Sequence, residues 1–262
     1  MSIQLLIATM HQTDHSLIER MHISSDAVVI NQCDQESKEM FDFNNNHILW
    51  INTKERGLSK SRNMAIRSAT AEICMIADDD MVYRTDYVDI VTSAFARLNA
   101  DIIGFQVCGI EKKFKDYSEK EQKISYVKSM KMASVEIAFR RSIFEKKDIQ
   151  FDELIGAGTD FLMGEENAIL FQCLRKGLTI YYTPKVIADL HTGNSTWFTE
   201  RNENFFICKG SYFAAMKTPF TTFLIWQWAI RKRGLYKGNM SISKAIKLMQ
   251  MGKRSYIKKA KG

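Results

Sequence analysis

Proline and long apolar runs are both scarce in this chain of 262 residues. It contains only two prolines, and no apolar run approaches the roughly 18 to 20 residues that a transmembrane helix requires. The low proline content, with 13 glycines, also excludes collagen-like and proline-rich low-complexity sequence. With 45% hydrophobic and 26% charged residues, the chain has the composition of a globular protein that buries a full core.

Cysteine is sparse and irregularly spaced. The five cysteines are scattered, and no two stand in a C-x-x-C pattern, which argues against a zinc site or a disulfide framework. We expect reduced thiols that mostly fill the core. The first residues lack the basic segment and the length of a secretory signal, which favours a cytoplasmic protein.

Acidic residues are missing from the last part of the chain. The net charge is +7, but the last acidic residue is Glu203, and 13 of the 37 basic residues follow it. Residues 1–203 therefore contain 24 basic and 30 acidic residues, a net charge of −6. We predict two domains, an acidic body at residues 1–203 and a basic helical tail at residues 204–262.

The body alternates short apolar runs with helix-like stretches, as in βαβ units around a mostly parallel sheet. Some runs, such as residues 73–77, are apolar on both faces, which indicates strands covered by helices on both sides. The pattern predicts a doubly wound α/β fold that binds ligands at the carboxyl ends of its strands. The predicted strands are 3–8, 27–31, 47–51, 72–77, 101–107, 134–140 and 178–183, the last ended by Pro184, and the predicted helices are 14–22, 59–70, 84–98 and 165–176.

Three successive carboxylates, Asp78, Asp79 and Asp80, follow the apolar run 73–77. Adjacent carboxylates repel one another, and a hard divalent cation with oxygen ligands relieves that repulsion. The carboxyl end of such a strand is also where the phosphates of a nucleotide arrive. A metal and phosphate site is therefore expected here, and the alternative is a solvated acidic turn.

A second acidic pair, Glu165 and Glu166, begins the predicted helix 165–176, directly after Gly164. Acidic residues interact favourably with the N-terminal end of the helix dipole, so helix capping alone explains the pair. Its place along the chain, after the acidic strand end, an isolated strand and a glycine-rich turn at 156–159, favours a catalytic pair instead.

These motifs, with the segment 56–63 and with Tyr182-Thr183-Pro184 leading to His191, resemble the family 2 glycosyltransferases of GT-A fold, of the kind that build bacterial surface polysaccharides. The resemblance extends over residues 3–197. It implies that Asp78 and Asp80 hold Mn²⁺ or Mg²⁺, with His191 as a further ligand. It also implies that the catalytic base lies in the Glu165-Glu166 pair, where Glu166 replaces the family's usual aspartate.

The resemblance further places the acceptor beside Gly164 and Trp197. A structural histidine at 191 and a core tryptophan at 197 are the alternatives, and Arg56 and Arg62 could instead belong to a surface helix. The nucleotide-sugar donor is expected to contact Thr9, Gln32, Asp34, Arg56, Ser59, Arg62, Asn63, Asp78 and Asp79.

The expected reaction is the transfer of a sugar from a nucleotide donor to a hydroxyl of a glycan or a polyprenyl-linked glycan. A divalent ion neutralises the diphosphate leaving group, and one carboxylate base is sufficient for an inverting displacement. A nucleotidyltransferase of similar fold would show a glycine-rich phosphate loop after the first strand, and residues 8–14 contain no glycine. A non-catalytic glycan- or lipid-binding scaffold is the other alternative.

The tail contains an apolar, aromatic run at residues 220–230, followed by Arg231-Lys232-Arg233. Eleven residues are too few to span a bilayer but suit a helix lying on an anionic membrane surface, here the inner face of the cell membrane. The alternatives are a helix packed on the body or at a homo-oligomer interface. A nucleic-acid partner is not expected, because the aromatic and basic residues are not interleaved and the body is acidic. We expect one apolar and one basic helix after residue 205.

Overall fold

The computed structural model describes residues 1–193 and 201–262, and this part of the chain forms two compact units. The sheet unit comprises residues 1–56, 60–150 and 173–193. The helical unit comprises residues 57–59, 151–172 and 201–262, so it joins the tail to a segment from the middle of the chain. The domain boundary after residue 203 stays a prediction.

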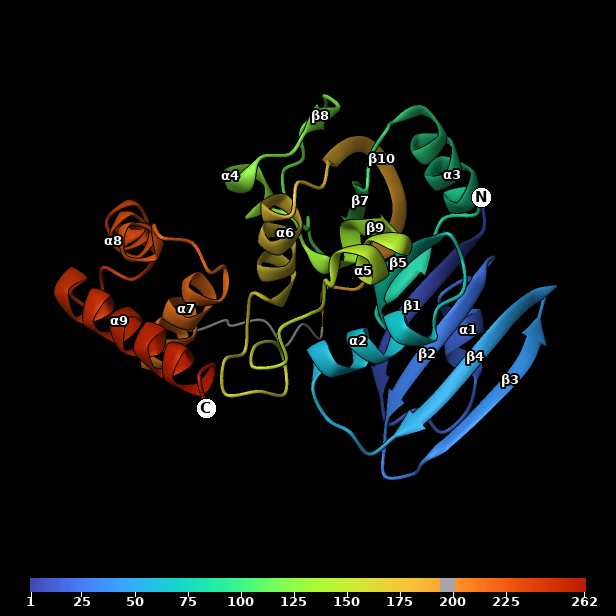
Figure 1. The fold of residues 1–262 in the computed structure, drawn as a ribbon, viewed down its shortest axis with the longest axis horizontal. Coiled ribbons are helices and arrows are strands. Elements are labelled where there is room, and N and C mark those ends of the chain that lie inside the picture. Colours follow the sequence, from blue (N-terminus) through green and yellow to red (C-terminus); the bar gives the residue numbers. More distant parts are fainter. Residues whose placement is uncertain (194–200) are drawn as a thin grey trace. The chain divides into compact units, whose positions relative to one another are not determined.

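The sheet unit is built on a 10-stranded sheet in the order β3-β4-β2-β1-β5-β9-β7-β10-β6, with β8 paired to β10 (Figure 1). The strands are β1 (Ile3–Met10), β2 (Asp26–Gln32), β3 (Ser37–Phe43), β4 (Asn46–Thr53), β5 (Ile73–Asp78), β6 (Met81–Tyr83), β7 (Ile102–Gly109), β8 (Gln122–Lys123), β9 (Ile137–Arg140) and β10 (Ile180–Leu190). The helices of the chain are α1 (Ser16–Arg20), α2 (Leu58–Ser68), α3 (Tyr87–Arg97), α4 (Tyr126–Ser129), α5 (Ser142–Lys147), α6 (Glu165–Arg175), α7 (Glu203–Ala215), α8 (Thr221–Arg231) and α9 (Ile242–Lys259).

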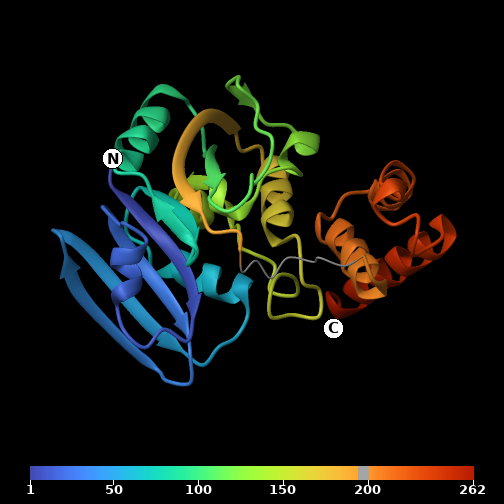
Figure 2. The same ribbon diagram turned by 180° about the vertical axis from the view of Figure 1, so that it is seen from behind.

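Four neighbouring strands, β4, β2, β1 and β5, run parallel and appear in blue to cyan in Figures 1 and 2. Side chains on both faces of these strands are buried, as Leu5 and Leu6 of β1 and Val28 and Val29 of β2 show. This burial explains why these strands read as continuous apolar runs in the sequence. The predicted α/β class is confirmed.

Beyond β5 the sheet becomes mixed. Strand β9 lies between β5 and β7 and runs antiparallel to both. This strand is shorter than the predicted strand 134–140, because it begins at Ile137 after a 3-10 turn (Ser134–Glu136). Its residues are buried in succession, whereas the sequence predicts alternating burial. The edge strand β3 was not predicted, because its residues are largely polar and exposed, and the short β6 was not predicted either.

The prediction that Pro184 ends the last strand is wrong. Strand β10 continues through Pro184 to Leu190. Its pairing with β7 shifts register between Tyr182 and Val186, so the proline falls where the ladder is already interrupted. A residue without a backbone N–H is tolerated at such an irregularity.

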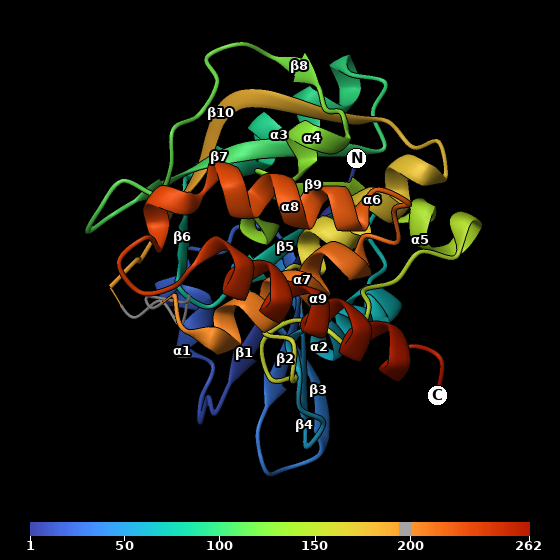
Figure 3. The ribbon, with the colours of Figure 1, turned by 90° about the vertical axis from the view of Figure 1, so that its left-hand side faces the viewer.

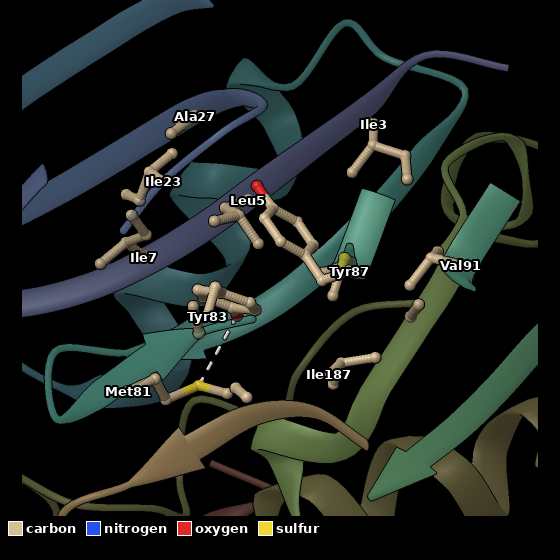
Figure 4. Close-up of a cluster of buried hydrophobic side chains, with 14 of the residues drawn as sticks. Ile3, Leu5, Ile7, Ile23, Ala27, Met81, Tyr83, Tyr87, Val91 and Ile187 are labelled. Carbon is tan, nitrogen blue, oxygen red and sulfur yellow. Dashed lines mark hydrogen bonds between the residues drawn. The ribbon is translucent and has the colours of Figure 1, made fainter. Parts of the chain in front are cut away.

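The core of the sheet unit packs side chains of β1 against α3, as Figure 4 shows for Leu5, Ile7, Tyr87 and Val91. All four residues are fully buried. The Tyr87 hydroxyl donates a hydrogen bond to Ser25 Oγ at 2.7 Å, so the polar end of this buried ring has a partner. These contacts hold α3 against the parallel strands.

In the helical unit, the tail forms three helices, α7, α8 and α9, rather than the two predicted (Figure 3). Helices α7 and α9 cross at two glycines. A Cβ on Gly210 would lie 1.8 Å from the Met249 carbonyl oxygen, and one on Gly252 would lie 1.9 Å from that of Ile207. None of the helices described here combines the length and apolar character that a membrane span needs.

Gly210→Ala should lower the free energy of unfolding by roughly 1 to 3 kcal/mol, because the new methyl group forces α7 and α9 apart. Thermal and urea denaturation followed by circular dichroism measure the effect. Gly238→Ala is the matched control, since no atom lies within 4 Å of a Cβ at that position. Equal stability of the two variants would show that the helices do not depend on this close approach.

Candidate active site

The carboxyl ends of the four parallel strands bring polar residues to one edge of the sheet. The register places Asn31 of β2 beside Thr9 of β1 and beside Asn52 of β4, while Asp78 of β5 pairs with Ala8. In an open α/β sheet, this edge is where ligands bind. At the edge where the sequence predicts the site, the neighbouring residues are therefore Thr9, Asn31, Asn52 and Asp78.

An amide network organises this edge. Asn31 Nδ2 donates to Asn52 Oδ1 at 2.8 Å and to the Gln12 carbonyl at 2.9 Å, and the Gln12 backbone N–H donates to Asn31 Oδ1 at 3.0 Å. Gln12, Asn31 and Asn52 are not among the site residues predicted from the sequence. The two asparagines could have been identified from the sequence, because each is a polar residue at or just beyond the end of an apolar strand.

A cavity of about 390 Å³ opens beside the network. It is lined by residues that follow β1 and β2, among them Gln12 and Asp34, and by the rings of His15 and Trp50, whose centroids are 4.7 Å apart. The combination of ring surfaces, amides and a carboxylate at this volume is suited to a small polar ligand with a planar group.

Two predicted donor residues, Arg56 and Asp34, form an ion pair beside this cavity. Arg56 Nη2 donates to Asp34 Oδ1 at 2.7 Å, and Arg56 Nη1 donates to the Cys33 carbonyl at 2.9 Å. The Asp34 side chain is 92% exposed, so this carboxylate remains open to a ligand. Gln32, the last residue of β2, is buried.

Two of the three carboxylates at the end of β5 are held by the protein itself. Arg62 of α2, 2% exposed, donates from Nη2 to Asp78 Oδ1 at 3.0 Å and to Ser134 Oγ at 2.8 Å. The Thr9 hydroxyl donates to Asp79 Oδ2 at 2.5 Å. The predicted donor residues Thr9 and Arg62 therefore stabilise the acidic strand end, and direct donor contact by either stays a prediction.

Asp80 differs from its two neighbours. Burial, followed by the like charges of Asp78 and Asp79, raises the pKa of the Asp80 carboxyl to about 6. Its Oδ1 is buried and has no hydrogen-bond partner among the residues that the structure describes. A buried carboxylate oxygen without a partner is suited to bind a cation. The cation would supply the missing partner and lower the repulsion among Asp78, Asp79 and Asp80.

His191 lies next to Asp80, because its backbone N–H donates to the Asp80 carbonyl at 2.9 Å. Its ring Nδ1 is 2.9 Å from Glu111 Oε1. Hydrogen bonds from the His191 ring, which have the largest effect, and from the Thr192 backbone lower the pKa of Glu111 to about 2, so Glu111 is ionised and accepts a hydrogen bond from His191 Nδ1. This contact leaves Nε2 of His191 available, as in histidines that bind metals or phosphates. Glu111 was not identified from the sequence.

In residues 1–193 and 201–262, no three histidine, cysteine or acidic side chains are gathered as a preformed metal centre. Asp78, Asp80 and His191 remain predicted metal ligands, and a bound phosphate group would have to complete the coordination of the metal. Asn63 of α2 is buried. Trp197 lies outside the described residues.

Within the helical unit, Gly156 brings the start of α2 to the start of α6. A Cβ at Gly156 would lie 3.1 Å from Ser59 Oγ and 3.3 Å from the Glu165 carboxylate, and its φ of +106° is in the region that favours glycine. The Ser59 hydroxyl donates to the Ile155 carbonyl at 2.7 Å. A predicted donor residue and a predicted catalytic residue therefore face each other across this glycine.

Glu166 has different surroundings from the buried Glu165. It is half-buried, and its charge acts on both Lys209 and Tyr212 of α7. Lys209 Nζ lies 3.6 Å from the centroid of the Tyr212 ring, and burial lowers the pKa of Lys209 to about 8. Tyr212 also covers Gly164, where a Cβ would lie 2.0 Å from Tyr212 Cδ2. The start of α6 is thus fixed on α7, with a cation beside Glu166.

Solved structures show which class of fold this is. A crystal structure of S. aureus TarS 1–349 superposes with a TM-score of 0.62 at 12% identity, covering 99% of this chain and 92% of that one, and the complex of TarS 1–349 with UDP-GlcNAc gives the same values. A longer TarS structure gives a TM-score of 0.60 at 11% identity and is covered over 55% of its length. The fold is therefore the GT-A fold, as predicted. Among curated proteins, none matches this chain.

The sequence profile of glycosyl transferase family 2 matches residues 8–162, which is more than half of the chain. The chain belongs to this family and is a glycosyltransferase. The matched segment contains the polar edge of the sheet and the Asp78-Asp79-Asp80 triplet. The predicted family is confirmed.

Arg62→Met should lower the free energy of unfolding by roughly 2 to 4 kcal/mol, because it leaves Asp78 without its cation beside two other carboxylates. Urea denaturation of Arg62→Met, Asp78→Asn and the double variant forms a double-mutant cycle. We expect the Arg62 substitution to cost less once Asp78 is neutral. An identical cost in both backgrounds would show that the pair contributes no coupling.

Proposed function

We propose that this chain is an inverting, metal-dependent glycosyltransferase that moves a sugar to a hydroxyl of a glycan or polyprenyl-linked glycan during surface polysaccharide synthesis. The observation that carries the proposal is the buried, unpartnered oxygen of Asp80 within three adjacent carboxylates at a ligand-binding strand edge. An arrangement of this kind is costly without a bound cation.

The donor site that we propose begins in the cavity of the sheet unit. Asp34, with its exposed carboxylate, is placed to accept hydrogen bonds from the ribose or base, and Arg56 orients it. The ligands named for the TarS crystals are UDP-GlcNAc and UDP, so UDP-sugars are the first donors to test.

Asp78 and Asp80 would hold Mn²⁺ or Mg²⁺, and diphosphate oxygens would complete the ligand set. A bound divalent ion neutralises the charge that develops on the departing diphosphate. His191, whose ring contacts Glu111, lies beside Asp80 through its backbone hydrogen bond, and we propose that it contributes either to the metal or to a phosphate.

Asp80→Asn should abolish the rise in melting temperature that Mn²⁺ and UDP produce together. Without metal, the same substitution should raise the free energy of unfolding at pH 7.5 by roughly 1 to 2 kcal/mol, because a desolvated and repelled charge is removed. Differential scanning fluorimetry and urea denaturation measure the two effects.

Asp86→Asn, an exposed position before α3, is the matched control and should leave the Mn²⁺ response intact. An unchanged Mn²⁺ response in Asp80→Asn would remove the metal assignment while leaving the family assignment in place.

Glu166 is the proposed catalytic base. A single carboxylate that takes the proton from the acceptor hydroxyl, while that oxygen attacks the sugar opposite the leaving diphosphate, inverts the anomeric configuration. Glu166 is the more accessible of the pair, whereas Glu165 is buried against Gly156 and Ser59. The ammonium group of Lys209 favours the ionised form of Glu166 that a base requires.

Glu166→Gln should lower kcat by at least about a hundredfold with little change in the donor KM, since it removes proton transfer without removing donor contacts. Initial rates with a coupled nucleoside-diphosphate assay separate the two constants. A loss confined to KM would instead place Glu166 in binding.

Lys209→Met tests the assignment of Glu166 as the catalytic base in a second way. Without the cation, protonation of Glu166 becomes easier, so the acid limb of the kcat–pH profile should move to higher pH by roughly one unit. Lys209→Arg should restore the profile. An unshifted limb would mean that Glu166 is not the group that titrates during catalysis.

The tail is proposed to hold the enzyme on the inner face of the cell membrane, where a polyprenyl-linked acceptor would be found. Helix α8 exposes apolar side chains, and the charge of the chain after Glu203 is entirely positive. Both features favour an anionic lipid surface.

A further inference from the structure

A second cavity, of about 310 Å³, lies within the helical unit where α7, α8 and α9 meet. Its rim carries three lysines, Lys217 after α7, Lys253 on α9 and Lys261 after α9. Its floor is formed in part by Ala214 and Tyr256, which are buried. The volume is at the lower end of the range typical of small-ligand sites, about 300 to 1,000 Å³.

The three lysines are free to bind an anion. In the described part of the chain, none of them forms an ion pair with a carboxylate, whereas the neighbouring Lys259 is paired with Asp160 at 2.7 Å. Lys253 Nζ donates only to a neutral group, Thr222 Oγ1, at 2.7 Å. Three cations around an apolar floor, without acidic partners, suit a phosphate group that carries an apolar body.

An exposed apolar face begins beside this cavity. Phe220, Phe223, Trp226 and Ile230 are 66%, 63%, 51% and 58% exposed, while Ile225 and Ala229 of the same helix are fully buried. At 100° per residue, the exposed side chains lie on the side of α8 opposite the buried ones. We call these four residues the α8 row. Helix α8, which runs across Figure 3, therefore exposes this row of apolar side chains on the side away from its packed face.

We propose that the cavity binds the phosphate of an anionic phospholipid, while the α8 row enters the boundary between headgroups and acyl chains. The inference rests on the proposed membrane role of the tail and identifies the part of the tail that contacts lipid. Aromatic and aliphatic side chains flanked by lysine and arginine are typical of helices that lie in this boundary. The flanking cations are Lys217 before α8, and Arg231 and Lys232 at its end.

Charge favours lipid over a second copy of the chain. In a symmetric dimer through the α8 row, each copy would bring the same basic residues to the interface. No acidic residue follows Glu203, so no carboxylate of the tail helices beyond that position compensates them. An anionic lipid surface supplies the opposite charge.

The test compares the full-length chain with two triple variants of equal charge. The cavity variant is Lys217→Gln, Lys253→Gln and Lys261→Gln, and the control variant is Lys237→Gln, Lys247→Gln and Lys258→Gln, all exposed positions outside the cavity. Each is sedimented with vesicles of phosphatidylcholine containing about 30% phosphatidylglycerol, and with vesicles of phosphatidylcholine alone. Circular dichroism melts establish that every variant is folded.

We expect the cavity variant to lose at least about tenfold in partition coefficient on the anionic vesicles, and the control variant less than threefold, because only the cavity lysines gather around one headgroup. Phe223→Ser should also weaken binding on the same vesicles. In the wild-type chain, tryptophan fluorescence should be quenched by brominated lipid, and Trp226→Phe should lose most of that quenching.

Equal losses in the two triple variants would overturn the cavity assignment while leaving the membrane role of the tail intact. Absence of vesicle binding by the wild-type chain would overturn both. A melting-temperature rise with inorganic phosphate that disappears in the cavity variant, without vesicle binding, would show a soluble phosphate ligand and contradict the lipid assignment. Self-association that Phe223→Ser abolishes, measured by light scattering without any vesicle binding, would identify a second copy as the occupant.

Discussion

Electrostatic repulsion within Asp78-Asp79-Asp80 is the constraint on which the polar edge of the sheet depends. The buried guanidinium of Arg62 neutralises Asp78, and the Thr9 hydroxyl binds Asp79. Arg62 is in turn held by Ser134, which leads into the antiparallel strand β9. The inserted strand and helix α2 thus both support the acidic strand end, while Asp80 retains a raised pKa and a buried oxygen that a cation would satisfy.

Close backbone approaches have the corresponding role in the helical unit. Gly156 and Gly164, both at positive φ, leave room for Ser59, Glu165 and the Tyr212 ring around the start of α6. A side chain at Gly156 would crowd Ser59 and Glu165, and one at Gly164 would overlap the Tyr212 ring, because both Cβ positions lie closer to these atoms than ordinary van der Waals contact allows. The difference between a buried Glu165 and a half-buried Glu166 beside Lys209 follows from this packing.

The distribution of charge connects the two proposals for this enzyme. The net charge of +7 combines a body of net charge −6 with a tail that has no acidic residue after Glu203. The carboxylates of the body include the proposed metal ligands and base. The lysines of the tail include the three around the second cavity, next to the exposed row of α8. The proposed catalytic residues would therefore lie in the acidic part of the chain, and the proposed membrane contact in the basic part.

Sequence patterns alone were enough to predict the α/β class, the buried parallel strands, the family and the two acidic motifs, because apolar runs and adjacent carboxylates are local features of a chain. The folded structure was needed to show that β9 lies antiparallel between β5 and β7, and that β10 continues through Pro184. It also paired His191 with Glu111, 80 residues away, and Arg62 with Asp78. Strand order, register and such pairs depend on how distant segments meet in space, which the hydrophobic pattern of each segment does not encode.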